Sequence, residues 1–276
     1  MMQLPTQEMV VFLMAACLYT VAAVVAAVQL RSKKETVTRF IVGLVCAAVC
    51  LDCVILVFRA VSIKAIPLTG LFESMLVLII VLGLSYVLMS FGMTQIWFSA
   101  VMIWPMFGLT VLAALVAEPA ATATMVVTPW TVFHAISMLL SSCAMIFSTA
   151  TASLYLLTDH MLKHKKVMSV LGRVPNIGWL RLAHKRGLIT CLVGMTMGLV
   201  SGIGLAVAMG WTDWMTDPKI VLIAATWCLL IVILSWHSFA GLSERAMAYA
   251  TIVMLFFVIF AVVGVTLFCG TQHVFT

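Results

Sequence analysis

Two histidines and a tryptophan-rich stretch are the residues of this chain whose types could do chemistry together. His134 follows the segment TPWTVF, and His273 lies in GTQHVF. The stretch GWTDWMTDPK, residues 210–219, holds two tryptophans, two aspartates and a proline. A neutral imidazole is a good axial ligand for haem iron, and two imidazoles on opposite sides would make the iron six-coordinate.

A haem held by two imidazoles needs further contacts, and residue types that suit them are present. The indole rings of Trp211 and Trp214 would cover the porphyrin. The propionates would need a cation such as Arg59 or Lys219. Tryptophan is also enriched at membrane interfaces because its ring is amphipathic, so both indoles could be interfacial residues and nothing more. The residues by themselves leave both interpretations open.

The composition shows whether these residues belong to a soluble protein or to a membrane protein. Of the 276 residues, 64% are hydrophobic and only 9% are charged. A soluble domain is nearer to about half apolar and about a quarter charged. The chain is therefore an integral membrane protein, and its organisation is determined by its spans and connections.

Apolar runs long enough to cross a hydrocarbon core about 30 Å thick can be placed eight times. The runs are continuous rather than alternating, which excludes membrane-spanning strands. We therefore predict an all-α, polytopic membrane helical bundle that forms a single domain over residues 1–276. The predicted spans are residues 9–30, 40–60, 70–91, 96–117, 131–157, 187–209, 220–240 and 247–269.

The lysines and arginines are spread unevenly over the connections, which predicts the orientation of the chain. All but three of the 15, namely Arg59, Lys64 and Lys219, lie in the first, fifth and seventh connections. Connections rich in Lys and Arg face the cytoplasm. We therefore expect both termini outside, a basic cytoplasmic loop at 158–187 and an outer Trp-rich loop at 210–219. The net charge of +6 then reflects orientation and contact with the lipid bilayer, not a nucleic acid partner.

This topology brings His134, His273 and the Trp-rich loop to the same outer face from three separate connections. The remaining polar residues of interest are expected to be less informative. We expect His160, His164 and His184 to be solvated, because the cations around them in the basic loop disfavour metal binding. Asp52 lies within the second span, where an ionised acid is costly. We expect it to be protonated and hydrogen-bonded between helices, with a proton-linked or haem-linked role as the alternative.

Four segments, in this order and at these spacings, are similar to the CcsA/HemX-type cytochrome c assembly proteins, whose haem-handling loop is known as WWD. The resemblance runs from about residue 55 to the C-terminus. The segments are LVFRAVSIKAIPLTGLFES with Arg59 and Glu73, the helix that opens TPWTVFH, LVSGIGLAVAMGWTDWMTDPK, and GTQHVF.

The resemblance implies a protein of the bacterial inner (plasma) membrane that binds haem b non-covalently at its outer, periplasmic face. Such a protein presents haem to apocytochrome c for covalent attachment, together with a CcsB/ResB-type membrane partner, as part of a cytochrome c haem lyase system. The residue matches imply the following roles: His134 and His273 as axial ligands, Trp211, Trp214 and Asp217 as the haem-contacting loop, and His237 as the histidine that the family places within the membrane.

Three alternatives stay open. Thr216 and Ile220 stand where the family's loop has Trp and Glu, which favours a HemX-like regulator of haem synthesis without ligation activity. A cytochrome b-type electron-transfer subunit would need histidine pairs deep within the spans. A membrane transporter would more often show broken helices and repeated halves, and Pro105 is the one clear interior break in the predicted spans.

Overall fold

The computed structural model describes residues 4–30, 36–64, 70–91, 96–116, 128–164, 175–210 and 214–265. Every regular element within these ranges is a helix, and eight of the helices are long and apolar enough to cross a membrane. The predicted all-α class with about eight spans is therefore confirmed. The side of the membrane on which the termini lie stays a prediction, as does the description of the chain as a single domain.

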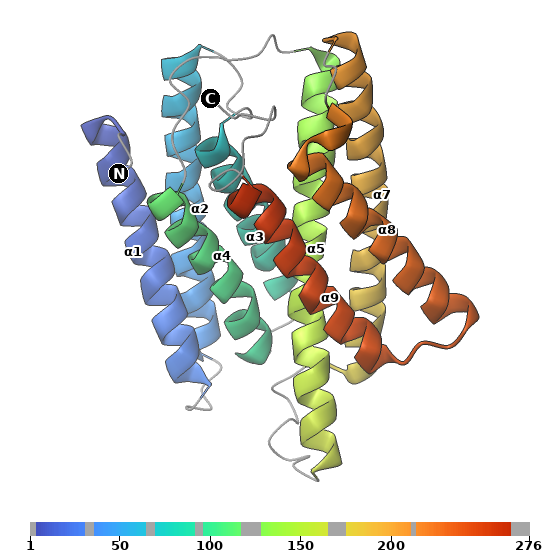
Figure 1. The fold of residues 1–276 in the computed structure, drawn as a ribbon. Coiled ribbons are helices and arrows are strands. Elements are labelled where there is room, and N and C mark those ends of the chain that lie inside the picture. The colour runs from blue at the N-terminus through green and yellow to red at the C-terminus, as the bar shows by residue number, and fades with distance from the viewer. Residues whose placement is uncertain are drawn as a thin grey trace. The chain divides into compact units, whose positions relative to one another are not determined.

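The helices follow one another as shown in Figure 1. Their bounds are α1 Thr6–Gln29, α2 Thr36–Ile63, α3 Leu71–Ser90, α4 Ile96–Val116, α5 Pro129–Lys163, α7 Ile177–Ala208, η1 Trp214–Thr216, α8 Pro218–Phe239, α9 Glu244–Ile259 and η2 Phe260–Gly264. Helices α1 to α4 belong to one compact unit, here called unit 1. The greater part of α5, together with α7, α8 and α9, belongs to a second, unit 2.

Helices α5 and α7 extend well past the spans predicted for them. With 35 and 32 residues they measure roughly 52 and 48 Å, against a hydrocarbon core of about 30 Å. Hydrophobicity predicts where a helix leaves the hydrocarbon core but not where it ends, since charged residues continue a helix well in water. The Lys163 ammonium, for example, lies 3.7 Å from the Asp159 carboxylate one turn earlier. Much of the segment 158–187, predicted as a loop, is therefore helical.

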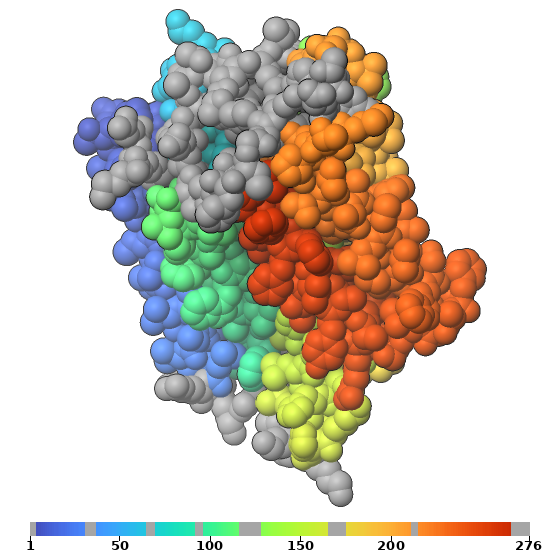
Figure 2. Space-filling view, in the orientation of Figure 1, coloured from blue at the N-terminus to red at the C-terminus, as the bar shows by residue number. Residues whose placement is uncertain are grey.

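Unit 1 is a bundle of four helices in which each helix packs mainly against two others. Helix α1 contacts α2 and α4, and α3 contacts the same two helices. On the face drawn in Figure 2, the side chains of α1 and α4 lie against one another. Aromatic side chains are the largest of those buried in its interior, and the ring centroids of Phe12 and Phe72 lie 5.5 Å apart.

Asp52 is buried inside unit 1, where the Tyr19 hydroxyl of α1 donates a hydrogen bond of 2.9 Å to a carboxyl oxygen of Asp52. The expectation of an Asp52 hydrogen bond between helices is confirmed. Tyr86 of α3 and Ser99 of α4 form a second such bond, also of 2.9 Å. In a bilayer such bonds hold helices together because lipid offers polar groups no other partner.

Gly83 of α3 is the point of closest approach to α2, and we predict that it does not tolerate a side chain. A Cβ there would clash with the Val49 side chain, which is buried and β-branched and so has little freedom to move. Gly83→Ala is expected to lower the free energy of unfolding by about 1–3 kcal/mol. The control is Gly43→Ala on α2, because a Cβ there meets no described atom within 4 Å. Thermal unfolding in detergent measures both variants, and equal stability would contradict the prediction.

In unit 2, helices α5 and α7 run antiparallel and approach closely along a line of glycines. Small residues permit this approach, which van der Waals contact then stabilises in a membrane. Glycines with higher residue numbers in α7 face α5 residues with lower residue numbers, as expected for antiparallel helices. The pairs are Gly187 with Ser148, Gly194 with Ser141, Gly198 with Met138, and Gly202 with His134. Helices α8 and α9 pack against each other, and their side chains join those of α5 and α7 in one apolar core.

Candidate functional site

His134 lies in the second turn of α5, at the beginning of that helix. Thr128 caps the helix by accepting a hydrogen bond from the Thr131 N–H at 3.2 Å, and Pro129 occupies the first helical position. The His134 ring packs on α7, where its Nδ1 atom lies 2.7 Å from the Gly198 carbonyl oxygen. The ring is half-buried there and its orientation is defined by that contact.

Asp217 and Lys219 stand at the beginning of α8. The Asp217 carboxylate caps this helix by accepting a hydrogen bond of 2.9 Å from the Lys219 backbone N–H, and Pro218 opens the helix. Both side chains are buried. Helix α7 ends at Ala208, ten residues before Pro218, and a Cβ at its Gly202 would touch the His134 ring. The beginning of α5, the end of α7 and the beginning of α8 therefore meet at one end of unit 2.

Three residues predicted for the same site have side chains that the structure does not describe. Trp211 and His273 lie outside the described residues. Trp214 opens the short helix η1, but its side chain is not described. The predicted meeting of His134 with His273 beside two indoles therefore stays a prediction.

His237 is at the opposite end of α8. It lies 19 residues beyond Pro218, which corresponds to roughly 28 Å along the helix axis. Its Nδ1 atom donates to the Leu242 carbonyl oxygen at 2.9 Å, and its Nε2 atom is 3.7 Å from the Glu244 carboxylate. The imidazole thus closes the connection between α8 and α9, and the fold does not bring it to the end of unit 2 that holds His134.

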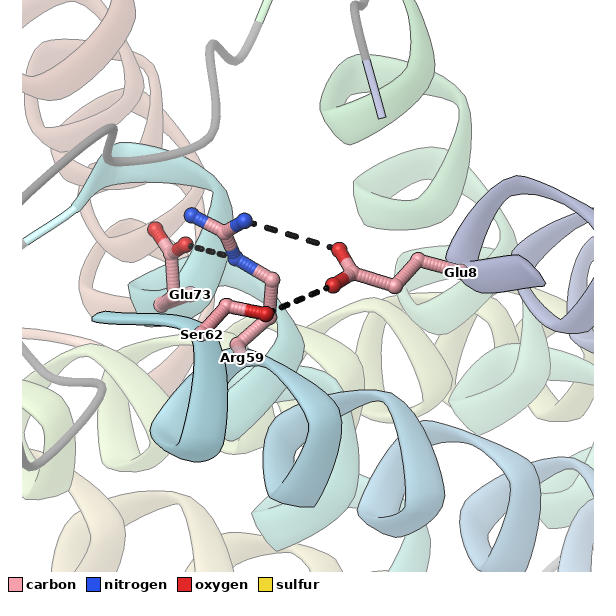
Figure 3. A network of polar contacts seen from close by, with 4 residues as sticks. All are labelled: Glu8, Arg59, Ser62 and Glu73. Atoms are coloured by element: carbon pink, nitrogen blue, oxygen red, sulfur yellow. Dashed lines mark hydrogen bonds and ion pairs between the residues drawn. The ribbon is translucent and has the colours of Figure 1, made fainter. Parts of the chain in front are cut away.

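Arg59 belongs to unit 1, where its guanidinium contacts two carboxylates (Figure 3). Its Nε atom lies 2.7 Å from the Glu73 carboxylate, and its Nη1 atom is 3.5 Å from Glu8. The Ser62 hydroxyl also donates to Glu8, at 3.2 Å. Glu8 and Glu73 lie in the first turns of α1 and α3, where the helix dipole favours a negative charge.

The sequence pointed to Arg59 as a possible propionate partner and to Glu73 as a motif residue, but it did not predict that the two pair with each other or that Glu8 joins them. The span ends could have indicated this network. Glu8, Arg59 and Glu73 lie at or near ends of the predicted spans 9–30, 40–60 and 70–91. Successive spans alternate in direction, so these ends fall on the same side of the bundle. The proposed role of Arg59 toward a propionate stays a prediction.

His184 is not solvated, which corrects the expectation drawn from its basic neighbours. It is buried in unit 2, and its Nε2 atom lies 2.9 Å from the Thr251 hydroxyl of α9. That hydroxyl donates to the Met247 carbonyl, so the imidazole donates in turn. His160 and His164 are exposed as expected.

The chain matches a known protein family over most of its length. A family model described as "Cytochrome C assembly protein" matches residues 68–273. This chain belongs to the cytochrome c assembly protein family. Searches of curated proteins and of solved structures found no match. The resemblance inferred from the four sequence segments is thereby confirmed.

Membership in the cytochrome c assembly family gives the protein a role in cytochrome c maturation, and its apolar helices make it a multi-pass membrane protein. The matched range begins just before α3 and ends at His273, so it includes both predicted axial histidines and the loop 210–219. Glu8 and Arg59 lie before it. The ion-pair network of unit 1 therefore joins the matched region, through Glu73, to helices outside it.

Proposed function

We propose that this assembly protein binds haem b non-covalently and presents it, at the outer face of a bacterial inner membrane, for covalent attachment to apocytochrome c. Membership in the family supports the role in maturation. The observation that supports a haem site is the hydrogen bond between the His134 imidazole and the Gly198 carbonyl. It fixes the ring at the end of unit 2 where α8 begins. Metal-ligating histidines are generally held by such a hydrogen bond from the second ring nitrogen.

In this proposal His134 and His273 are the axial ligands, and Trp211, Trp214 and Asp217 contact the haem from the loop 210–219. Arg59 is proposed as a propionate partner and His237 as a contact for haem within the membrane. Bound haem would supply the vinyl groups that react with the cysteines of apocytochrome c, while the protein orients the haem and limits access to its iron. A CcsB/ResB-type membrane protein is the proposed partner.

A pyridine haemochrome spectrum of the detergent-extracted protein tests the proposal, and we expect it to report haem b. Replacing both His134 and His273 by Ala is expected to abolish the Soret band, because it removes both axial ligands. The matched control replaces His160 and His164, which are exposed near the other end of α5, and is expected to leave the spectrum unchanged. A Soret band that survives in the first double variant would remove both residues as ligands. His237→Ala, recorded alongside, tests the third histidine separately.

The second candidate is a HemX-like regulator of haem synthesis without ligation activity. It is favoured by one observation, the presence of Thr216 and Ile220 where the assembly members have Trp and Glu. Co-expression with an apocytochrome c and a CcsB/ResB-type partner separates the two candidates, because only an assembly protein would yield covalently bound haem.

A further inference from the structure

We propose that two backbone features of α7, the carbonyl of Gly198 and the missing side chain of Gly202, are positioning elements that present His134 to iron through its Nε2 atom. The proposal rests on the proposed function, in which His134 is a haem ligand. It adds which ring nitrogen binds and which residues of α7 determine that choice.

The hydrogen bond to Gly198 assigns the tautomer of His134. A carbonyl oxygen can only accept, so the Nδ1 atom that lies 2.7 Å from it must carry the hydrogen. A neutral imidazole carries one N–H, so the lone pair suited to a metal is then on Nε2. The Ser201 hydroxyl is 3.5 Å from the same Nδ1 atom, but it lies closer to two carbonyl oxygens that can accept its hydrogen, that of Met197 at 2.7 Å and that of Gly198 at 3.1 Å.

Gly202 makes room for the ring in this orientation. A Cβ at position 202 would lie 2.8 Å from Cε1 of His134, closer than real Cβ contacts, and 3.0 Å from Nδ1, tighter than most of them. The imidazole is rigid and already lies 2.7 Å from the Gly198 carbonyl, so relieving this contact would strain that hydrogen bond. Gly198 and Gly202 are four residues apart and therefore lie on the same face of α7. The Gly198 carbonyl and Gly202 therefore contact the same His134 ring from successive turns of α7.

The neighbouring glycines indicate that this effect is specific to position 202. A Cβ at Gly198 would meet the end of the Met138 side chain, which is flexible. A Cβ at Gly204, two residues further along the same helix, meets no described atom within 4 Å. Gly204→Ala therefore makes the same chemical change in the same helix without touching His134, and it is the matched control.

The first arm of the test needs no haem. Full-length protein labelled with nitrogen-15 in its histidines is studied by solid-state NMR in lipid, and His134 is assigned by comparison with His134→Gln. We expect Nδ1 of His134 to be protonated and Nε2 not to be. The opposite tautomer would overturn the proposal, whatever the protein does with haem.

The second arm titrates haem b into wild-type, Gly202→Ala and Gly204→Ala proteins and follows the Soret band, after thermal unfolding has shown that each variant folds. Loss of a group that orients a metal ligand typically costs about 10- to 100-fold in affinity, and we expect that loss for Gly202→Ala alone. Equal haem affinity in the two variants would overturn the proposal. If Gly202→Ala does not fold, the first arm decides. If the wild-type protein binds no haem, the proposed function fails, while the tautomer measurement still decides the positioning of His134.

Discussion

Arg59→Met is expected to lower the free energy of unfolding of unit 1 by about 3–5 kcal/mol, because it removes a buried cation from between two buried carboxylates. The side chains of Glu8, Arg59 and Glu73 are each at most 5% exposed, so water cannot replace the lost charge. These residues join the beginning of α1, the end of α2 and the beginning of α3. Thermal and denaturant unfolding in detergent would measure the loss.

The chain provides a matched control for this prediction in Lys163→Met. The Lys163 side chain is 57% exposed and pairs with Asp159 at 3.7 Å, so its loss should cost less than about 1 kcal/mol. A second control adds Glu8→Gln and Glu73→Gln to Arg59→Met. It should recover part of the stability, because it leaves no unbalanced charge. If Arg59→Met were no less stable than Lys163→Met, the network would not stabilise unit 1.

His134→Ala is expected to reduce covalent haem attachment to background, which is the second large effect. The assay co-expresses the protein and a CcsB/ResB-type partner with an apocytochrome c, in a host without its own maturation system. Loss of an axial ligand leaves the haem without a defined orientation toward the cysteines that it must meet. Haem staining of the cytochrome after denaturing electrophoresis gives the yield of covalent product.

The same co-expression provides a control and separates the two candidate functions. His164→Ala replaces an exposed histidine of the same helix and should leave the yield unchanged. A wild-type protein that carries haem b but gives no covalent product with the partner would favour the HemX-like regulator. The double variant Thr216→Trp, Ile220→Glu would then test whether those two positions account for the missing activity.

The helical repeat of α7 predicts the burial of His184 better than the charged residues next to His184 in the sequence do. The buried face of α7 runs through Leu180, His184, Leu188 and Cys191 and continues to Gly198, at intervals of three to four residues and their multiples. His184 therefore belongs to the same stripe as the apolar core, although Lys185 and Arg186 follow it directly. Sequence neighbours suggested a solvated histidine, whereas the helical repeat, extended toward the N-terminus of α7, indicates a buried one.

The sequence by itself determined the all-α membrane fold, the number of spans and the family, and it indicated Asp52 as an interhelical hydrogen-bonding residue. These properties depend on local composition and on motif order: an apolar run must be helical in a bilayer, because its backbone has no other hydrogen-bond partners there. The length of an apolar run also locates the span, although the helices α5 and α7 continue past it into segments with charged residues.

Only the tertiary structure decided which polar groups meet. The Arg59 guanidinium finds Glu8 and Glu73 on two other helices, and the His134 ring finds the Gly198 carbonyl 64 residues away. Such contacts depend on the rotation of each helix about its axis and on its register against its neighbours. Rotation and register are set by the packing of whole faces, here the glycine face of α7 against α5, and no single motif encodes them.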